Sequence, residues 1–179
     1  MDVITEGKKI QNELVELRRY FHAHPELPWE EFNTQKKIME YLDELGIPYQ
    51  ESSKTGVIAT IKGPHSSDKI LGIRADIDAL PITEQAACAW KSQNEGKMHA
   101  CGHDGHMAIL LGAAKMLTAM KDRIEGDVYL AFQPAEETGA GAPDFMKFDN
   151  WFEKIDAIFG GHVWIDLPAG LISVEEGPR

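Results

Sequence analysis

KILGIRADID, residues 69–78, is the stretch that decides the fold, because a short apolar run leads directly into two aspartates. Two further apolar runs are also followed shortly by polar residues, namely residues 127–132 (DVYLAF) and 155–159 (IDAIF). Such runs, bounded by Pro or Gly, are typical of buried strands. Ligands bind outside the carboxyl ends of strands in open α/β sheets, so these polar residues are expected at one sheet edge. They are Asp76, Asp78, Glu136, Glu137 and His162.

Helical periodicity occupies much of the chain between the strands. Apolar residues recur at spacings of four, three and four over residues 10–21, which lines one face of a helix. A second helix is predicted over residues 29–45, and a long apolar helix over residues 104–120. Side chains along residues 57–62 alternate as they do in a strand, and residues 84–98 are predicted to form a loop. Strands separated by helices favour an α/β fold, with a mostly parallel sheet and helices on both faces.

Composition excludes several classes of function. The 179 residues carry a net charge of −11, which argues against nucleic acid or an anionic membrane surface as the main partner. No apolar stretch approaches the ~20 residues of a membrane helix, and the polar N-terminus predicts no secretory signal. Two cysteines cannot build a disulfide scaffold, so a cytoplasmic location is expected. The length suits one domain.

The densest cluster of ligand-type residues is MHACGHDGH, residues 98–106, which holds three of the seven histidines. In extended backbone, Cys101 and His103 would point to the same side and reach one metal ion, and thiolate with imidazole favours zinc or another transition metal. Asp104 suits the N-cap of the following helix. One alternative is a helix-start loop with incidental histidines. Another is a Cys101 nucleophile with His103 as base, although their spacing makes that geometry awkward.

The adjacent carboxylates of Glu136 and Glu137 predict a division of labour. In extended backbone they would diverge, so one would bind metal while the other serves as general base. The alternative is a solvated acidic turn. Asp78 is either a metal ligand itself or a carboxylate that orients a metal ligand, and the second interpretation is preferred. His162 alone is weak evidence for a metal site, and its expected position at the same sheet edge strengthens that evidence.

Together these motifs resemble the dinuclear-metal aminoacylase and carboxypeptidase family. The similarity is closest to its amidohydrolase branch, which includes hippurate hydrolases, N-acyl-amino-acid hydrolases and indoleacetyl-amino-acid hydrolases. It spans nearly all of the chain, and the Cys-Gly-His-Asp-Gly-His run is highly specific to the branch. The matching runs are RRYFHAHPELPWEEFNTQKKIMEYLDELGI (18–47), GIRADIDALPI (72–82), GKMHACGHDGHMAILLGAAKML (96–117), FQPAEETGAGA (132–142) and GGHV (160–163).

The resemblance implies a zinc-peptidase-like catalytic domain and a role for each matching residue. Cys101 corresponds to a metal-bridging cysteine, and His103, Glu137 and His162 to further metal ligands. Glu136 corresponds to the general base. The resemblance also implies two divalent metal ions (zinc, manganese or cobalt) and small-molecule N-acyl amino acid substrates whose amide bond is hydrolysed.

The resemblance further implies that the family's catalytic domain continues beyond the last residue here. Residues 1–179 are therefore expected to be the N-terminal part of that domain. The inserted lid or dimerisation domain and one more histidine ligand are expected to be missing. The competing hypothesis is a non-catalytic metal-binding fragment or interaction module. Homo-oligomers are a further expectation from the family.

Overall fold

The order of helices and strands along the chain follows the predicted α/β pattern. The computed structural model describes residues 2–64 and 67–174. The elements are α1 (Val3–Lys9), α2 (Gln11–Ala23), α3 (Phe32–Glu44), β1 (Tyr49–Ser52), β2 (Gly56–Lys62), β3 (Ile70–Asp76), α4 (His103–Ala119), the 3₁₀ turn η1 (Lys121–Arg123), β4 (Asp127–Gln133), the 3₁₀ turn η2 (Glu136–Thr138), α5 (Gly141–Lys147), the 3₁₀ turn η3 (Phe148–Asn150), α6 (Trp151–Lys154) and β5 (Ala157–Gly160).

The five strands form one sheet in the order β1-β2-β4-β3-β5. β3 lies between β4 and β5 and is parallel to both. β2 is antiparallel to β4 and to β1, so β2 alone runs against the other four strands. The predicted mostly parallel sheet is confirmed, with one reversed strand inside it. The carboxyl ends of β3, β4 and β5 therefore meet at one edge.

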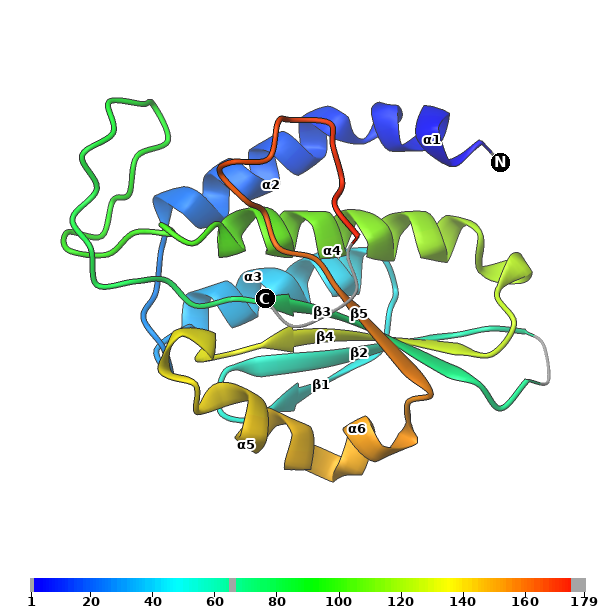
Figure 1. Ribbon diagram of the computed structural model, residues 1–179. Helices are drawn as coiled ribbons and strands as arrows, with labels where there is room; N and C mark the ends of the chain where they lie inside the picture. Colours follow the sequence, from blue (N-terminus) through cyan, green and yellow to red (C-terminus); the bar gives the residue numbers. More distant parts are fainter. Residues whose placement is uncertain (1, 65–66, 175–179) are drawn as a thin grey trace.

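Helices cover both faces of the sheet (Figure 1). On one face, α3 and α4 pack on the strands, and α2 lies against α4. The core there joins Phe21, Leu42 and Leu111 from the helices to Leu130 and Phe132 of β4. On the other face, α5 and α6 cover a smaller apolar cluster made of Ile58, Ala131, Phe145 and Trp151. Burial of apolar area on both faces stabilises the sheet.

The four predicted strands and three predicted helices are confirmed, with shifts of up to three residues at their ends. β1 is missing from the prediction because its sequence, YQES, is polar, and it forms only by pairing with β2. The short helices α1, α5 and α6 are also unpredicted. Residues 84–98 contain no helix or longer strand, as expected, and Met98 forms an isolated bridge with Leu80. Over the described ranges, no helix is both long and apolar enough to span a membrane.

Candidate metal centre

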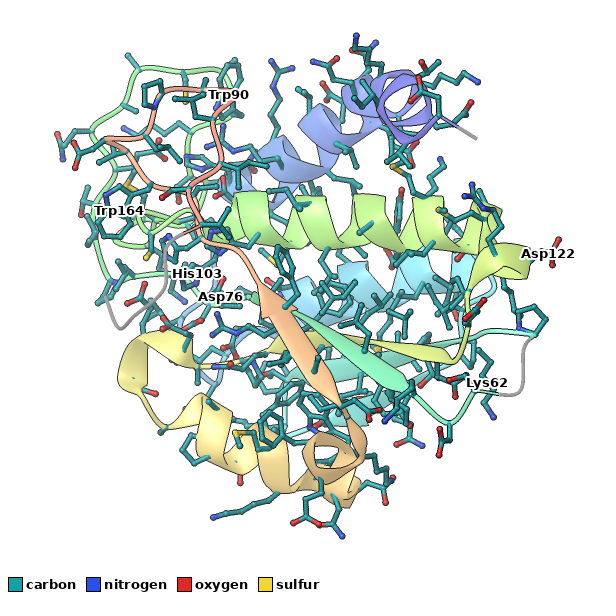
Figure 2. The ribbon with its side chains drawn as sticks, turned by 45° about the vertical axis from the view of Figure 1, so that its right-hand side comes forward. Lys62, Asp76, Trp90, His103, Asp122 and Trp164 are labelled. Carbon is teal, nitrogen blue, oxygen red and sulfur yellow. The ribbon has the colours of Figure 1, made fainter. Side chains whose placement is uncertain are left out.

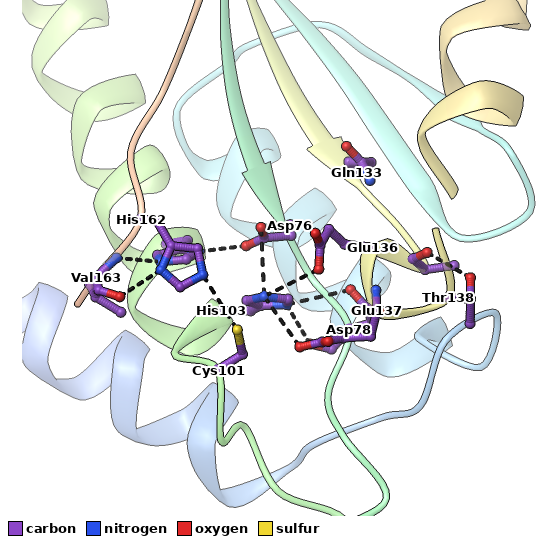
Figure 3. A network of polar contacts seen from close by, with 12 residues as sticks. Asp76, Asp78, Cys101, His103, Gln133, Glu136, Glu137, Thr138, His162 and Val163 are labelled. Atoms are coloured by element: carbon purple, nitrogen blue, oxygen red, sulfur yellow. Dashed lines mark hydrogen bonds and ion pairs between the residues drawn. The ribbon is translucent and has the colours of Figure 1, made fainter. Parts of the chain in front are cut away.

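The predicted site residues gather at the carboxyl edge of the three parallel strands. Asp76 ends β3 and is paired in register with Gln133, which ends β4. Figure 2 shows Asp76 and His103 near this end of the sheet, with Lys62 of the reversed strand β2 at the opposite end. The turn after β4 supplies Glu136, and the segment after β5 supplies His162 (Figure 3). The expected convergence at one edge is confirmed.

His103 lies at the centre of the cluster, at the first residue of α4, with 1% of its side chain exposed. Its Nδ1 lies 2.8 Å from the backbone oxygen of Asp78 and donates to it, which directs Nε2 into the site. Nε2 has no hydrogen-bond partner among the residues that the structure describes. Three carboxylates surround it, at 3.6 Å from Asp76, 3.7 Å from Glu137 and 3.8 Å from Glu136. Burial opposes a charged imidazole, but the aspartates Asp78 and Asp76 outweigh it and raise the pKa of His103.

Cys101 reaches the cluster through a tight turn and not through extended backbone. Gly102, between Cys101 and His103, is the N-cap of α4 and has φ +91°, a left-handed conformation that favours glycine. The Cys101 Sγ lies 3.4 Å from Nε2 of His162. Burial and the neighbouring Glu137 carboxylate raise the pKa of Cys101 to about 12. A raised pKa is the opposite of what a cysteine nucleophile needs, so that alternative loses support.

The two glutamates converge, contrary to the expectation that they would diverge. That expectation assumed extended backbone, whereas Glu136 begins the 3₁₀ turn η2 after a left-handed Ala135 at φ +51°. The Glu136 side chain is 39% exposed and that of Glu137 is 20% exposed. Oε1 of Glu137 is buried, and within residues 2–64 and 67–174 it has no hydrogen-bond partner. The more exposed carboxylate suits a base that meets water and the more buried one suits a ligand, and the division of labour between them stays a prediction.

Asp78 contacts the site in two ways that suit the predicted orienting role. Its backbone oxygen accepts the hydrogen bond from His103, and its Oδ2 accepts one from the backbone N–H of Glu137 at 3.0 Å. Oδ1 of Asp78 lies 3.5 Å from Nδ1 of His103 and has no hydrogen-bond partner in the described part of the chain. Asp78 therefore contacts two predicted ligands at once.

Asp76 and His106 belong to the cluster, although the sequence pattern predicted no role for either side chain. Nδ1 of His106 lies 2.5 Å from Oδ1 of Asp76, and Nε2 of His106 accepts from the backbone N–H of Val163 at 2.9 Å. Burial opposes ionisation of Asp76, but the bond from His106, helped by His103 and Arg74, lowers its pKa to about 2. The available signal was helical spacing, since residues 103 and 106 lie on one face of α4.

Asp104 is not the N-cap of α4, so that expectation is wrong. Gly102 takes the N-cap position, and Asp104 lies buried in the first helical turn. Its Oδ2 accepts from Nε of Arg18 at 2.9 Å and contacts Nδ1 of His22 at 2.8 Å. The other ring nitrogen of His22 lies 3.1 Å from Glu84. Asp104 thus ties α2 to the start of α4, which carries His103.

The donor atoms fit divalent metal ions. Among the described residues, three groups of side chains each have their donor atoms within 4.8 Å of one another, and all three groups share His103. Thiol, imidazole and carboxylate donors together favour transition metals over magnesium or calcium. The unpartnered Nε2 of His103 and Oε1 of Glu137 are buried polar atoms that a cation would satisfy. The three groups are Cys101–His103–His162, Asp76–His103–His106 and His103–Glu136–Glu137.

Known proteins share both the sequence and the fold. The chain is 44% identical over 173 residues to N-acetylcysteine deacetylase of Bacillus subtilis, covering 96% of this chain and 45% of that protein. It is 38% identical over 171 residues to N-acyl-L-amino acid amidohydrolase of Geobacillus stearothermophilus, covering 95% and 46%. The crystal structure of the Bacillus subtilis YXEP protein, described as a dinuclear metal binding peptidase from the M20 family, superposes with a TM-score of 0.91 at 44% identity, covering 96% and 48%.

The chain spans less than half the length of these relatives. The superposition confirms the predicted zinc-peptidase-like fold for the part that is present. The family model described as peptidase family M20/M25/M40 matches residues 72–177, which is more than half of the chain and includes every predicted site residue. The chain therefore belongs to peptidase family M20/M25/M40.

Proposed function

We propose that the protein containing this chain is a metal-dependent hydrolase that cleaves the amide bond of N-acyl amino acids. One observation carries the proposal: the buried, open Nε2 of His103 faces the partly exposed carboxylate of Glu136 at 3.8 Å. Such an arrangement supports the proposal of a base that water can reach, acting beside a set of metal donors. The names of the deacetylase and amidohydrolase relatives support the substrate class.

Each side chain has a distinct task in the proposed reaction. Cys101, His103, Glu137 and His162 would hold two divalent ions, and zinc, manganese or cobalt would suit these donors. When bound, such ions polarise the scissile carbonyl and make the attacking water more acidic. Glu136 takes the proton from that water and delivers it to the leaving amine. Asp78 fixes the ring of His103 through its backbone oxygen.

The test uses the intact gene product loaded with zinc, manganese or cobalt in turn. The expected result is release of free amino acid from N-acetyl or N-benzoyl amino acids, abolished by a chelator. Metal bound without release across a broad panel would favour the alternative of a non-catalytic metal-binding module.

A cytoplasmic location fits a site that needs a free thiol at Cys101. Sizing of the same protein tests the predicted homo-oligomer.

Variants separate the base from the ligands. Glu136→Gln should lower turnover by about 100- to 10,000-fold while metal content stays unchanged, because the amide cannot accept the proton. Cys101→Ala and His103→Ala should each lower metal content, measured by elemental analysis after gel filtration. Glu125→Gln is a matched control, since Glu125 is exposed near the opposite end of the sheet. Normal turnover in Glu136→Gln would refute its assignment as base.

A further inference from the structure

Glu31 is a fully buried carboxylate outside the metal centre, with 0% of its surface exposed. Burial raises its pKa, and hydrogen bonds from Thr55 and from backbone N–H groups partly offset that cost. An unpaired buried carboxylate is expensive unless hydrogen bonds satisfy it. Its two oxygens are satisfied in this way: Oε2 accepts from the Thr55 hydroxyl at 2.6 Å, and Oε1 accepts from the backbone N–H of Ala135 at 2.8 Å.

The local explanation, that Glu31 caps a helix, does not hold. Glu31 occupies the N-cap position of α3, but its side chain makes no capping hydrogen bond. The carboxylate instead joins residues that flank two neighbouring strands of the sheet. Thr55 directly precedes β2, and Ala135 follows β4 at the end where the site lies. The contact with Ala135 spans 104 positions in the sequence.

Ala135 is the residue at which the chain turns toward the metal centre. It is fully buried and has φ +51° and ψ +40°, a left-handed conformation that residues other than glycine avoid. Such a conformation persists only when its surroundings impose it. The backbone oxygen of Ala135 accepts from Thr138 and Gly141, which closes the turn on itself. Its N–H is held by Glu31.

The turn that carries the two glutamates is therefore anchored at two backbone amides. Glu31 holds the N–H of Ala135, and Asp78 holds the N–H of Glu137 at 3.0 Å. Glu136 lies between the two anchored positions. We propose that Glu31 is a positioning residue that fixes the left-handed turn at Ala135 and so aims both glutamates at His103. This inference rests on the proposed function and extends it to a residue that does not touch the reacting groups.

Two substitutions at Glu31 separate geometry from charge. Glu31→Gln keeps the length of the side chain: its amide oxygen accepts from Ala135, and its amide nitrogen donates to the Thr55 hydroxyl, which can also accept. Glu31→Asp keeps the charge but is one methylene shorter, so it cannot reach both donors. Thr55→Val is the matched control, because it removes one hydrogen bond of Glu31 and leaves the bond to Ala135.

The first measurement is amide hydrogen exchange of the intact gene product, which requires neither metal nor turnover. The Ala135 amide should exchange slowly in the wild type, in Glu31→Gln and in Thr55→Val, and at least tenfold faster in Glu31→Asp. A wild-type Ala135 amide that exchanges as fast as those of exposed residues 85–87 would overturn the proposal. That comparison stands even where Glu31→Asp fails to fold.

The second measurement is affinity for zinc, manganese or cobalt, with turnover where the wild type shows it. Glu31→Asp should weaken metal binding by about 10- to 100-fold, the usual cost of losing a group that orients a ligand. Its kcat should fall more than its KM changes, and Glu31→Gln should restore both. Equal losses in Glu31→Asp, Glu31→Gln and Thr55→Val would overturn the positioning role. Absence of hydrolysis in the wild type would refute the proposed function and leave amide exchange to decide the role of Glu31.

Discussion

Gly102→Ala is the substitution that most directly tests how the loop before α4 builds the site. Gly102 has φ +91°, and a Cβ at this position would lie 2.3 Å from Cγ2 of Val163. Gly46→Ala is a matched control, because Gly46 also has a left-handed φ of +66° but a Cβ there meets nothing within 4 Å. Both substitutions strain the backbone, and only the one at Gly102 presses on the segment that carries His162.

The expected loss of stability follows from those two contributions. A left-handed alanine costs about 1–2 kcal/mol at either position. Overpacking adds about 1–3 kcal/mol at Gly102 alone. The unfolding free energy should therefore fall by about 2–5 kcal/mol in Gly102→Ala and by about 1–2 kcal/mol in Gly46→Ala. Metal affinity should fall only in Gly102→Ala, because displacement of Val163 pulls on its bond to His106 and moves the neighbouring His162.

The assay is urea unfolding in the presence of a chelator, followed by tryptophan fluorescence, together with zinc titration of the folded protein. The chelator separates the stability of the chain from the stabilisation that bound metal adds. Equal unfolding free energies for the two variants would refute the reasoning about Val163. Unchanged zinc affinity in Gly102→Ala would refute the link from Val163 to the metal centre.

Two further predictions concern titration. The hydrogen bond to Asp104 outweighs burial and raises the pKa of His22. The stability that this bond contributes is therefore fully present below the unfolded-state pKa of about 6.5. It is lost as the pH rises through the raised folded-state pKa. Urea unfolding across pH measures the difference in unfolding free energy between the wild type and His22→Gln. This difference should shrink over that pH window, and a constant difference would contradict the prediction. Because the pKa of Cys101 is about 12 without metal, only about one thiol in 10⁴ is ionised at pH 8, and alkylation in the presence of a chelator should be slow by mass spectrometry. Alkylation of metal-free Cys101 at the rate of a free peptide thiol would show that the thiol is not held in this environment.

Local patterns in the sequence were sufficient to predict most of the fold. The strands over 69–75 and 127–132 are apolar runs, so their burial and their type follow from composition. The rule that sites form at the carboxyl ends of parallel strands then placed the acidic residues at one edge, and the structure confirms this. The sequence pattern does not predict the edge strand β1, because its polar residues form a strand only by pairing with β2.

The finer geometry of the site depends on contacts between residues far apart in the sequence. The turn at Ala135 is left-handed, and the residue that holds its amide, Glu31, lies in another element. Asp104 has the chemistry of an N-cap, but a bond to His22, 82 positions away, gives it a different partner. A single sequence contains no local sign of either contact. Side-chain direction within the cluster therefore required the folded structure.

The strand order also constrains how the chain can fold. β2 and β4 are neighbours in the sheet, yet they bring together residues as distant as Val57 and Phe132. A folding chain must close these long loops before the cysteine, histidines and glutamates meet, and topologies dominated by such distant pairings fold slowly. Metal added during refolding should consequently leave the rate of sheet formation nearly unchanged and slow unfolding. A site that assembles last stabilises the native state but does not speed its formation.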